Sequence, residues 1–476
     1  MPGQHFSLTT ADLRKRRPGG SMSATTGTRG KRWIEHWDPE DESFWESTGK
    51  RIARRNLWFS VFAEHVGFSI WTLWSVMVLF MGPEYGLSAA DKFLLVSTPT
   101  LVGALMRLPY TFAVAKFGGR NWTIISAALL LIPTVLAAVV LEPGTSLTTF
   151  MVVAALGGVG GGNFASSMTN INTFYPERLK GAALGLNAGG GNLGVAAIQL
   201  IGLLVISTAG ATEPRLVLYI YIPLIVLAAA FAWRYMDNLA TVKGDTKAMR
   251  EVVKDSHTWV MSFLYIGTFG SFIGYSFAFG LVLQNQFGRS PLQAAAVTFL
   301  GPLLGSFSRP AGGWLADRLG GAKVTFATFV GMALATGVLI LASNTNSLAL
   351  FTVAFIVLFV LTGVGNGSTY KMIPAIFRVK AKAAIESGAD KTAELLKARK
   401  LSGALIGLAG AIGALGGLFI NLAFRQSFAD TKSGVPAFVA FLAFYGVCFA
   451  VTWAVYLRKP AAETSQRGLA LAHAEV

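Results

Sequence analysis

Two arginines lie inside stretches that are otherwise apolar. Arg107 occurs in LVGALMRLPYTFAV and Arg309 in FLGPLLGSFSRPAGGW. A guanidinium group is planar and permanently charged, and its parallel N–H bonds can hold two oxygens of a planar anion. The alternative is a structural arginine paired with a carboxylate, but neither stretch has an acid at a level that could pair with it. We therefore expect both arginines to bind a small planar anion.

The stretch from 156 to 195 combines many glycines with polar side chains. In a helix in water each glycine would cost up to ~1 kcal/mol, whereas in a membrane small residues let helices pack closely. We expect two spanning helices, at 156–175 and 181–208, joined by a basic turn at 176–180. Their polar side chains either bond between helices or line a water-filled pathway: Asn163, Ser166, Ser167, Asn170, Asn187 and Asn192.

An acid and a histidine, Glu64 and His65, are adjacent near the middle of the first apolar run. Ionisable groups at such depth often carry protons, so both are proton-coupling candidates. Neighbouring helical residues point about 100° apart, so we expect only one of them to face a pathway. The alternative is a neutral, hydrogen-bonded structural pair.

The composition is that of an integral membrane protein. The 476 residues are 53% hydrophobic and only 13% charged, with a mean hydropathy of +0.54, whereas soluble domains are about one quarter charged. Cys448 is the single cysteine, which excludes a disulfide framework. The histidines are scattered, so we expect no metal, no cofactor and no enzymatic centre.

Apolar runs long enough to cross a bilayer follow one another along the chain. The twelve predicted spans are 57–81, 93–116, 121–142, 147–175, 181–208, 215–236, 257–284, 291–316, 323–343, 347–377, 401–426 and 435–457. The predicted fold is all-α, with a six-helix bundle at 57–236, a central loop at 237–256 and a second bundle at 257–457. Residues 1–56 and 458–476 are predicted tails.

The positive charges concentrate in the tails and the even-numbered loops, whereas the odd-numbered loops hold only Lys92, Arg215, Arg289, Arg425 and Lys432. This asymmetry predicts that both termini are cytoplasmic, in the inner (plasma) membrane. It also explains the net charge of +16 without nucleic-acid binding. Tryptophans at 33, 37 and 45 suggest a segment lying on the inner membrane interface.

The two halves of the chain resemble each other. Arg309 lies 202 residues after Arg107, and each is followed eleven residues later by a Gly-Gly pair. GGGNFASSM at 160–168 matches GVGNGSTYK at 363–371, and each is followed by a proline expected to end its helix, Pro176 or Pro374. Such a repeat predicts two pseudo-symmetric bundles with a site between them at the midplane.

With these features the chain resembles the major facilitator superfamily and, within it, the nitrate/nitrite porter family. The superfamily resemblance includes the loop GGWLADRLGG at 312–321. The family resemblance rests on GGGNFASSMTNI, on ALGLNAGGGNLGV at 183–195, on GAIGALGG at 410–417 and on FGSFIGYS at 269–276.

The resemblance implies a role for each matching position. The implied substrate-binding residues are Arg107, Arg309, Phe164, Asn192, Ala188, Tyr265 and Phe269. The implied residues of the signature and gating helices are Asn163, Gly189, Gly190, Gly191, Gly194, Asn366, Gly413, Gly416 and Gly417. Three features depart from the pattern: Ala188 replaces a common glycine, Leu415 replaces a frequent tyrosine, and not all members carry Glu64 and His65.

The resemblance and the arginines together predict a secondary transporter of nitrate, nitrite or both. Without an anion, the site would hold two unneutralised positive charges, which makes closure costly. We expect nitrate/proton symport, with nitrate/nitrite antiport as the alternative and a non-transporting anion receptor as a third reading. The expected partners are nitrate, nitrite, protons and the lipid bilayer.

Three further expectations concern the predicted cytoplasmic side. Lys371 is expected to reach the headgroups or form a gate rather than bind substrate. Asp317 and Arg318 are expected to belong to a latch between helices. Residues 378–400 form a long basic loop or a surface helix.

Overall fold

The computed structural model describes residues 32–240, 244 and 246–458, and most of them lie in helices. Eleven helical segments are long and apolar enough to cross a membrane. Large apolar side chains face outward from the bundle, among them Val139, Phe307 and Leu334, which are 66%, 63% and 68% exposed. Such an exterior suits lipid rather than water, and the chain is a multi-pass membrane protein.

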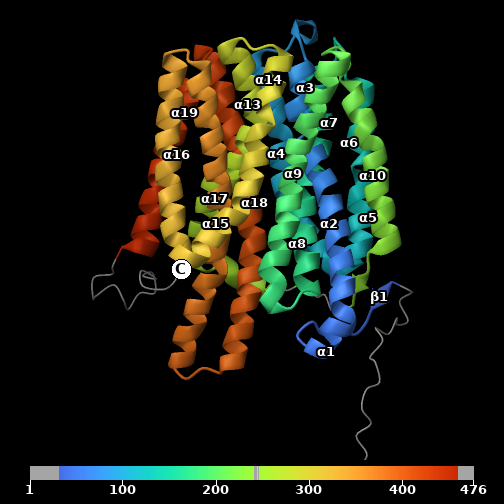
Figure 1. The fold of residues 1–476 in the computed structure, drawn as a ribbon, viewed down its shortest axis with the longest axis vertical. Coiled ribbons are helices and arrows are strands. Elements are labelled where there is room, and N and C mark those ends of the chain that lie inside the picture. Colours follow the sequence, from blue (N-terminus) through green and yellow to red (C-terminus); the bar gives the residue numbers. More distant parts are fainter. Residues whose placement is uncertain (1–31, 241–243, 245, 459–476) are drawn as a thin grey trace, which may run out of the picture.

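The first six predicted spans form one half of the molecule (Figure 1). Several are interrupted helices rather than single rods. The N-terminal half comprises α2 (Lys50–Trp71), α3 (Leu73–Phe80), η3 (Pro83–Tyr85), α4 (Ala89–Phe117), α5 (Gly119–Leu129), α6 (Leu131–Val140), α7 (Leu147–Gly157), η4 (Gly158–Gly162), α8 (Asn163–Phe174), α9 (Glu177–Ala209) and α10 (Arg215–Tyr235).

The remaining spans form the C-terminal half. It comprises α12 (Ser256–Tyr265), η5 (Ile266–Gly270), α13 (Ser271–Phe287), α14 (Pro291–Thr298), α15 (Leu300–Leu319), α16 (Gly321–Asn344), α17 (Leu348–Glu386), α18 (Lys391–Thr431), α19 (Val435–Thr452) and η6 (Trp453–Leu457). The eighth predicted span corresponds to α14 and α15, which are not among the eleven apolar segments. Ser306, Ser308, Arg309 and Asp317 make α15 more polar than the other spans.

The basic segment 378–400 is neither a loop nor a surface helix. Helix α17 continues to Glu386 and α18 begins at Lys391, so two spans extend beyond the bundle as a helical hairpin (Figure 1). Pro374 lies inside α17, so the expectation that it ends a helix is wrong. Pro176 does separate α8 from α9, although the predicted turn at 176–180 is mostly the first turn of α9. We call this side of the molecule the hairpin end.

Residues 33–49 fold against the hairpin end of the N-terminal half. Strand β1 (Trp33–Ile34) pairs in parallel with β2 (Asn238–Leu239), and α1 (Glu42–Phe44) and η2 (Trp45–Gly49) lead into α2. Trp37 and Trp45 are buried in a cluster with Phe174 and Tyr175. The structure therefore corrects the expectation that these tryptophans face the membrane interface, because they pack on protein. The predicted tails at 1–31 and 459–476 lie outside the described residues.

The residues between the halves form a short connection, in which α11 (Thr246–Val253) packs on α18. At its start, Asp237 accepts hydrogen bonds from Arg32, Arg55 and Asn56. The carboxylate thereby joins the N-terminal segment, the first residues of α2 and the end of the N-terminal half.

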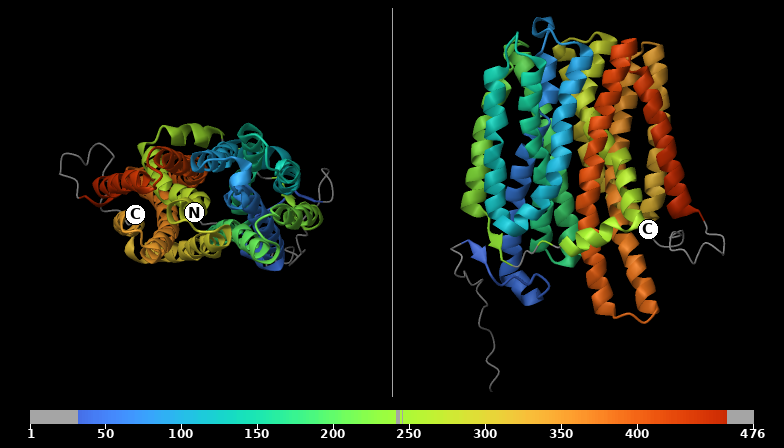
Figure 2. Two further views of the ribbon diagram at one scale, coloured as in Figure 1. Left: turned by 90° about the horizontal axis from the view of Figure 1, so that it is seen from above. Right: turned by 180° about the vertical axis from the view of Figure 1, so that it is seen from behind.

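The two halves stand side by side and contact each other mainly through α4 with α18 and α9 with α15 (Figure 2). At the end opposite the hairpin the contact is close. The ring of Phe93 stacks on Phe424 and Phe428, with centroids 5.5 and 5.1 Å apart. Gln199 donates to the Ser276 carbonyl at 2.8 Å.

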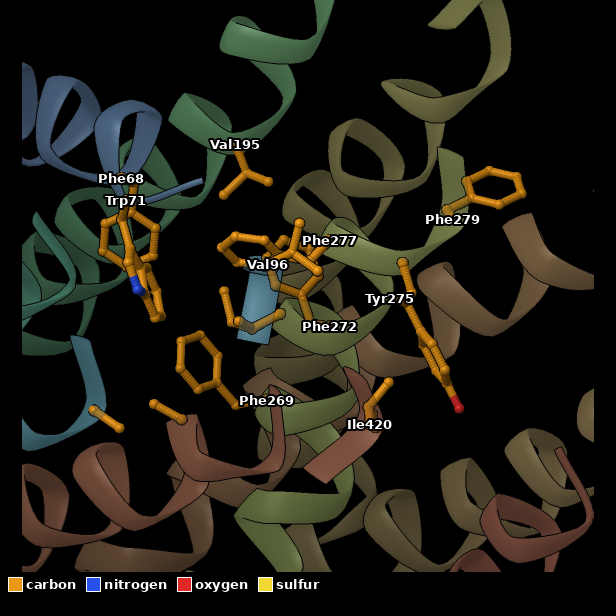
Figure 3. Close-up of a cluster of buried hydrophobic side chains, with 14 of the residues drawn as sticks. Phe68, Trp71, Val96, Val195, Phe269, Phe272, Tyr275, Phe277, Phe279 and Ile420 are labelled. Carbon is orange, nitrogen blue, oxygen red and sulfur yellow. The ribbon is translucent and has the colours of Figure 1, made fainter. Parts of the chain in front are cut away.

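An apolar cluster fills the interface between this end and the centre (Figure 3). Phe68, Trp71 and Val195 of the N-terminal half meet Phe269 and Phe277 of the C-terminal half, and the rings of Trp71 and Phe277 are 6.4 Å apart. The centre of the molecule is therefore closed from the end opposite the hairpin.

Candidate anion-binding site

Arg107 crosses from the N-terminal half to the C-terminal half. It projects from α4, is 0% exposed, and donates from Nη1 to the Gly410 carbonyl of α18 at 2.8 Å. Its Nε and Nη2 have no hydrogen-bond partner among the described residues. Buried N–H groups without partners are costly, especially on a charged group. This guanidinium therefore has two donors available for an anion.

Arg309 occupies the related position on α15 and is 6% exposed. Its Nη2 lies 3.4 Å from the Tyr265 hydroxyl, a long hydrogen bond. Its Nη1 has no partner among the described residues. Neither arginine forms an ion pair in the part of the chain that the structure describes. The alternative in which each arginine is structural and pairs with a carboxylate is therefore wrong.

Aromatic rings bring the two arginines together. The guanidinium carbons of Arg107 and Arg309 lie 4.6 and 5.9 Å from the centroid of the Phe164 ring. The centroid of the Phe269 ring lies 4.8 Å from the Arg107 guanidinium carbon and 6.2 Å from the centroid of the Phe164 ring. Tyr265 stacks on Phe269 at 5.2 Å. These contacts place the predicted arginines and aromatics in one buried cluster at the interface of the halves.

Two members of this cluster are not predicted from the sequence. Tyr370 of α17 packs on Tyr265 at 4.9 Å and lies 5.2 Å from the Arg309 guanidinium carbon. The ring of Trp71, on α2, lies 5.4 Å from the guanidinium carbon of Arg107. Tyr370 could have been found, because it follows Asn366 by one helical turn in the repeated segment GVGNGSTYK. Trp71 lies among several tryptophans with no distinguishing pattern.

Local backbone irregularities position the aromatic residues. Phe164 follows η4, a 3-10 segment of glycine and valine. A side chain at Gly161 would lie 2.7 Å from the Gly103 Cα, so only glycine lets η4 approach α4 this closely. Phe269 lies in η5, a π-helical turn, and such turns often occur at functional sites.

The signature glycines pack helices within each half. On α9, a methyl group at Gly191 would lie 2.3 Å from the Glu64 carboxylate, and Gly190 and Gly194 lie equally close to α2. On α18, a methyl group at Gly413 would lie 2.5 Å from the Tyr265 ring. Gly416 lies against Gly270, and Gly417 against Ile273. Gly189 differs, because no atom lies within 4 Å of a methyl group built there.

The predicted asparagines are buried and incompletely bonded. Asn192 and Asn366 are both 0% exposed, and neither side chain has a hydrogen-bond partner among the described residues. Asn163 lacks a partner at Oδ1. Ala188 is 1% exposed and packs in the apolar core. Within the part of the chain that the structure describes, neither Asn192 nor Ala188 forms a hydrogen bond or ring contact with either arginine, so their substrate-binding role stays a prediction.

Glu64 and His65 have different surroundings. The Glu64 carboxylate is 1% exposed and receives hydrogen bonds from Ser167 and, at 2.6 Å, from Asn187. Arg107 and Arg309 act on it electrostatically without bonding to it. The His65 ring instead lies 3.1 Å from the Gly190 carbonyl. The two side chains thus have different partners, and only Glu64 is within electrostatic reach of the central cations.

Lys371 forms an ion pair within the C-terminal half. Its ammonium group pairs with both oxygens of Asp317, at 2.9 and 2.8 Å, and so links α17 to α15. Arg318 lies over the Trp314 ring at 4.0 Å instead of joining that pair. Asp317 of the predicted latch thus pairs with Lys371 rather than acting together with Arg318, and this ion pair lies near the hairpin end.

Comparisons with known proteins agree with this architecture. Residues 57–419 match the sequence model of the Major Facilitator Superfamily. The D-xylose-proton symporter has a similar structure, with a TM-score of 0.63 at 15% identity over 84% of this chain and 95% of that chain. At that identity the likeness concerns the fold alone.

Sequence relatives are more specific. The chain is 40% identical over 448 residues to the nitrate/nitrite transporter NarU of Salmonella typhimurium, covering 90% of this chain and 96% of the relative. It is 33% identical to the probable nitrate/nitrite antiporter NarK2 of Thermus thermophilus, covering 90% and 97%. With this identity over nearly the whole length, the chain belongs to the nitrate/nitrite porter family of the major facilitator superfamily, a family of transporters rather than enzymes.

Proposed function

We propose that this protein transports nitrate across the cytoplasmic membrane by alternating access, and that nitrite is a second substrate of the same site. The observation that carries the proposal is the pair of buried guanidinium groups that have unpartnered N–H donors and lie 4.6 and 5.9 Å from the centroid of the Phe164 ring. Nitrate is small, planar and singly charged, so one ion can accept from both arginines while its faces contact Phe164 and Phe269. The names of the sequence relatives support the same substrates.

The transport cycle follows from the cost of burying charge. With no anion the site holds two positive charges in a closed apolar interface, an unfavourable state. A bound nitrate offsets part of this charge, so the halves can rock around the occupied site more easily than around the empty one. The positive charge of the hairpin end and its loops supports a cytoplasmic position for that end.

We propose nitrate/proton symport as the mode of coupling, with Glu64 as the proton carrier. With nitrate bound and Glu64 neutral, the two arginines, the anion and the acid sum to one positive charge. With nitrate gone and Glu64 ionised, the sum is again one positive charge. The carboxylate can therefore replace the anion electrostatically, so nitrate binding favours uptake of a proton and nitrate release favours its loss.

Nitrate/nitrite antiport is the second candidate, and the name of the Thermus thermophilus relative favours it. In this cycle Glu64 stays in one protonation state, and the arginines are occupied at every crossing. Flux of labelled nitrate into proteoliposomes separates the two modes. Symport predicts accumulation driven by an inward proton gradient with no internal anion, whereas antiport predicts uptake only into vesicles preloaded with nitrite. No nitrate flux under either condition would contradict the proposed function altogether.

A further inference from the structure

A second polar site lies inside the N-terminal half, away from the arginines. It is a small cavity with space for about one water molecule. Three helical segments, α2, α5 and α8, supply its lining residues, all of which except Ala63 carry a hydroxyl, amide or carboxyl group: Ser60, Ala63, Glu64, Thr123, Ser126, Asn163, Ser166 and Ser167. Four of these residues, Glu64, Asn163, Ser166 and Ser167, were considered above, whereas Ser60, Ala63, Thr123 and Ser126 are new.

Three polar atoms of the residues around this cavity lack partners, whereas the hydroxyl groups of Thr123, Ser126, Ser166 and Ser167 are hydrogen-bonded. Glu64 Oε1, Ser60 Oγ and Asn163 Oδ1 are buried without a hydrogen-bond partner among the described residues. Leaving such groups unsatisfied is unfavourable, because each loses the hydrogen bonds that it would make in water. A buried water typically makes about three hydrogen bonds to groups of this kind. One water among these atoms would satisfy them together.

The hydrogen bonds of Glu64 identify the oxygen that carries its proton. Oε2 accepts from both Ser167 and Asn187, so its lone pairs are already engaged. Oε1 has no such donor and packs near Gly191 of α9, and Glu64 is one of the residues that line the cavity. In the neutral acid the proton therefore lies on Oε1, where the water can accept it.

No charged group on the neighbouring helices competes for this proton. The cations that act on Glu64 are Arg107 and Arg309, and α5, α8 and α9 present hydroxyl and amide groups. The His65 ring is directed at the Gly190 carbonyl. The tyrosines of adjacent helices are Tyr110, whose ring packs on Trp122 and whose hydroxyl has no partner among the described residues, and Tyr221, which interacts with Ser69.

The polar groups continue from the cavity toward the hairpin end. Ser60 lies one turn before Glu64, nearer the start of α2, and Thr123 lies one turn into α5. Asn170 follows on the next turn of α8 and has no partner at Oδ1 or Nδ2. It packs on Gly119, where a methyl group would lie 1.9 Å from its Oδ1. Gly119 is the first residue of α5, at the hairpin end.

We propose that a water bound in this cavity relays the proton of Glu64 to the cytoplasm through the interior of the N-terminal half. The anion then leaves between the halves and the proton leaves within one half. Because every lining residue belongs to the N-terminal half, rocking of the halves leaves the relay intact. Release follows departure of nitrate, since only then do the arginines favour an ionised Glu64. The inference rests on the proposed role of Glu64.

The test compares two substitutions at Ser60 in the full-length protein. Ser60→Val fills the cavity with methyl groups and displaces the water, whereas Ser60→Ala removes one hydroxyl but leaves the space. Both are reconstituted into proteoliposomes with a pH-sensitive dye inside. We expect Ser60→Val to lose nitrate accumulation driven by a proton gradient and to keep nitrate/nitrite exchange at equal pH. Ser60→Ala should retain both activities.

Several outcomes would overturn the relay. Gradient-driven accumulation by Ser60→Val at the wild-type level would exclude the cavity from the proton route, and equal loss of accumulation and exchange would make Ser60 structural. Thr123→Val, which keeps side-chain shape, provides a second variant if Ser60→Val does not fold, and intact accumulation in it counts against the relay.

Accumulation driven by a sodium gradient at equal pH would mean that the cavity oxygens hold a metal cation instead. If wild-type protein carries nitrate with no response to pH, the proposed symport itself fails.

Discussion

At the scale of single residues, the central arginines are held by aromatic rings and one backbone carbonyl rather than by carboxylates. This arrangement leaves charge and N–H donors available at the interface of the halves. The function of each arginine then depends on the planar arrangement of its guanidinium N–H donors as well as on its charge.

Replacing either arginine with lysine tests this dependence. In Arg107→Lys and Arg309→Lys the charge remains, but the planar pair of donors is lost. We expect nitrate binding to weaken by about 1.5–3 kcal/mol, or roughly 10- to 100-fold, with little change in thermal stability. Binding to purified protein and flux in proteoliposomes measure the effect. Near-normal flux in one variant would remove that arginine from the site.

Glu64 offers a second residue-scale test, since an amide cannot titrate. Glu64→Gln should abolish accumulation driven by a proton gradient while preserving exchange of external nitrate for internal nitrite. His65→Asn is the matched control, because it alters the adjacent residue, whose ring faces the Gly190 carbonyl. A parallel loss of both activities in Glu64→Gln would assign the residue a structural role.

At the scale of elements, the glycines of α9 and α18 act mainly as packing surfaces. They bring α9 against α2 at Glu64, and they bring α18 against α12 at Tyr265 and against η5 at Gly270. Close approach of helix backbones is how membrane helices associate without a hydrophobic driving force. The signature sequences therefore position the functional side chains by packing against the helices that carry them.

A methyl group on α18 should disturb this packing in a position-dependent way. Gly413→Ala forces the added carbon to within 2.5 Å of the Tyr265 ring, and such overpacking costs about 1–3 kcal/mol. We expect a lower melting temperature in detergent and weaker nitrate binding. Gly403→Ala on the same helix is the control, because no atom lies within 4 Å of its added methyl. Equal effects of the two substitutions would argue against a specific role for Gly413.

At the scale of the whole molecule, the structure is closed at the end opposite the hairpin. Phe93 of one half stacks between α18 residues of the other, and the apolar cluster of Figure 3 continues the seal inward. Alternating access requires these contacts to separate during each cycle.

Covalent closure of this end should therefore stop transport. In a variant with Cys448→Ser, cysteines at Phe93 and Phe428, whose rings are 5.1 Å apart, would cross-link the halves. We expect oxidation to block nitrate uptake and reduction to restore it. Cysteines at Phe351 and Phe438, which lie 5.8 Å apart within the C-terminal half, are the control. Full uptake by the oxidised Phe93–Phe428 variant would show that this end need not open.

The sequence by itself determined the class of protein, the repeat and the central arginines. Hydropathy sets where the chain can cross a bilayer, and a charge inside an apolar run is rare enough to mark function. These signals are local, so they are readable without a fold. The helical hairpin was missed because polar, basic composition looks the same in a loop and in a helix extended into water, and Pro374 was accommodated within α17.

Only the tertiary structure decided which side chains meet. Tyr370 and Trp71 join the arginines because α17 and α2 turn those faces inward. Trp37 and Trp45 pack on α8 and its C-terminal end rather than on lipid, because strand pairing with Asn238–Leu239 folds their segment back. Glu64 and His65 are adjacent in sequence but have separate partners, since neighbouring helical positions face different helices. Contacts between distant segments depend on how helices pack against each other, and the hydropathy pattern does not specify which helices pack together.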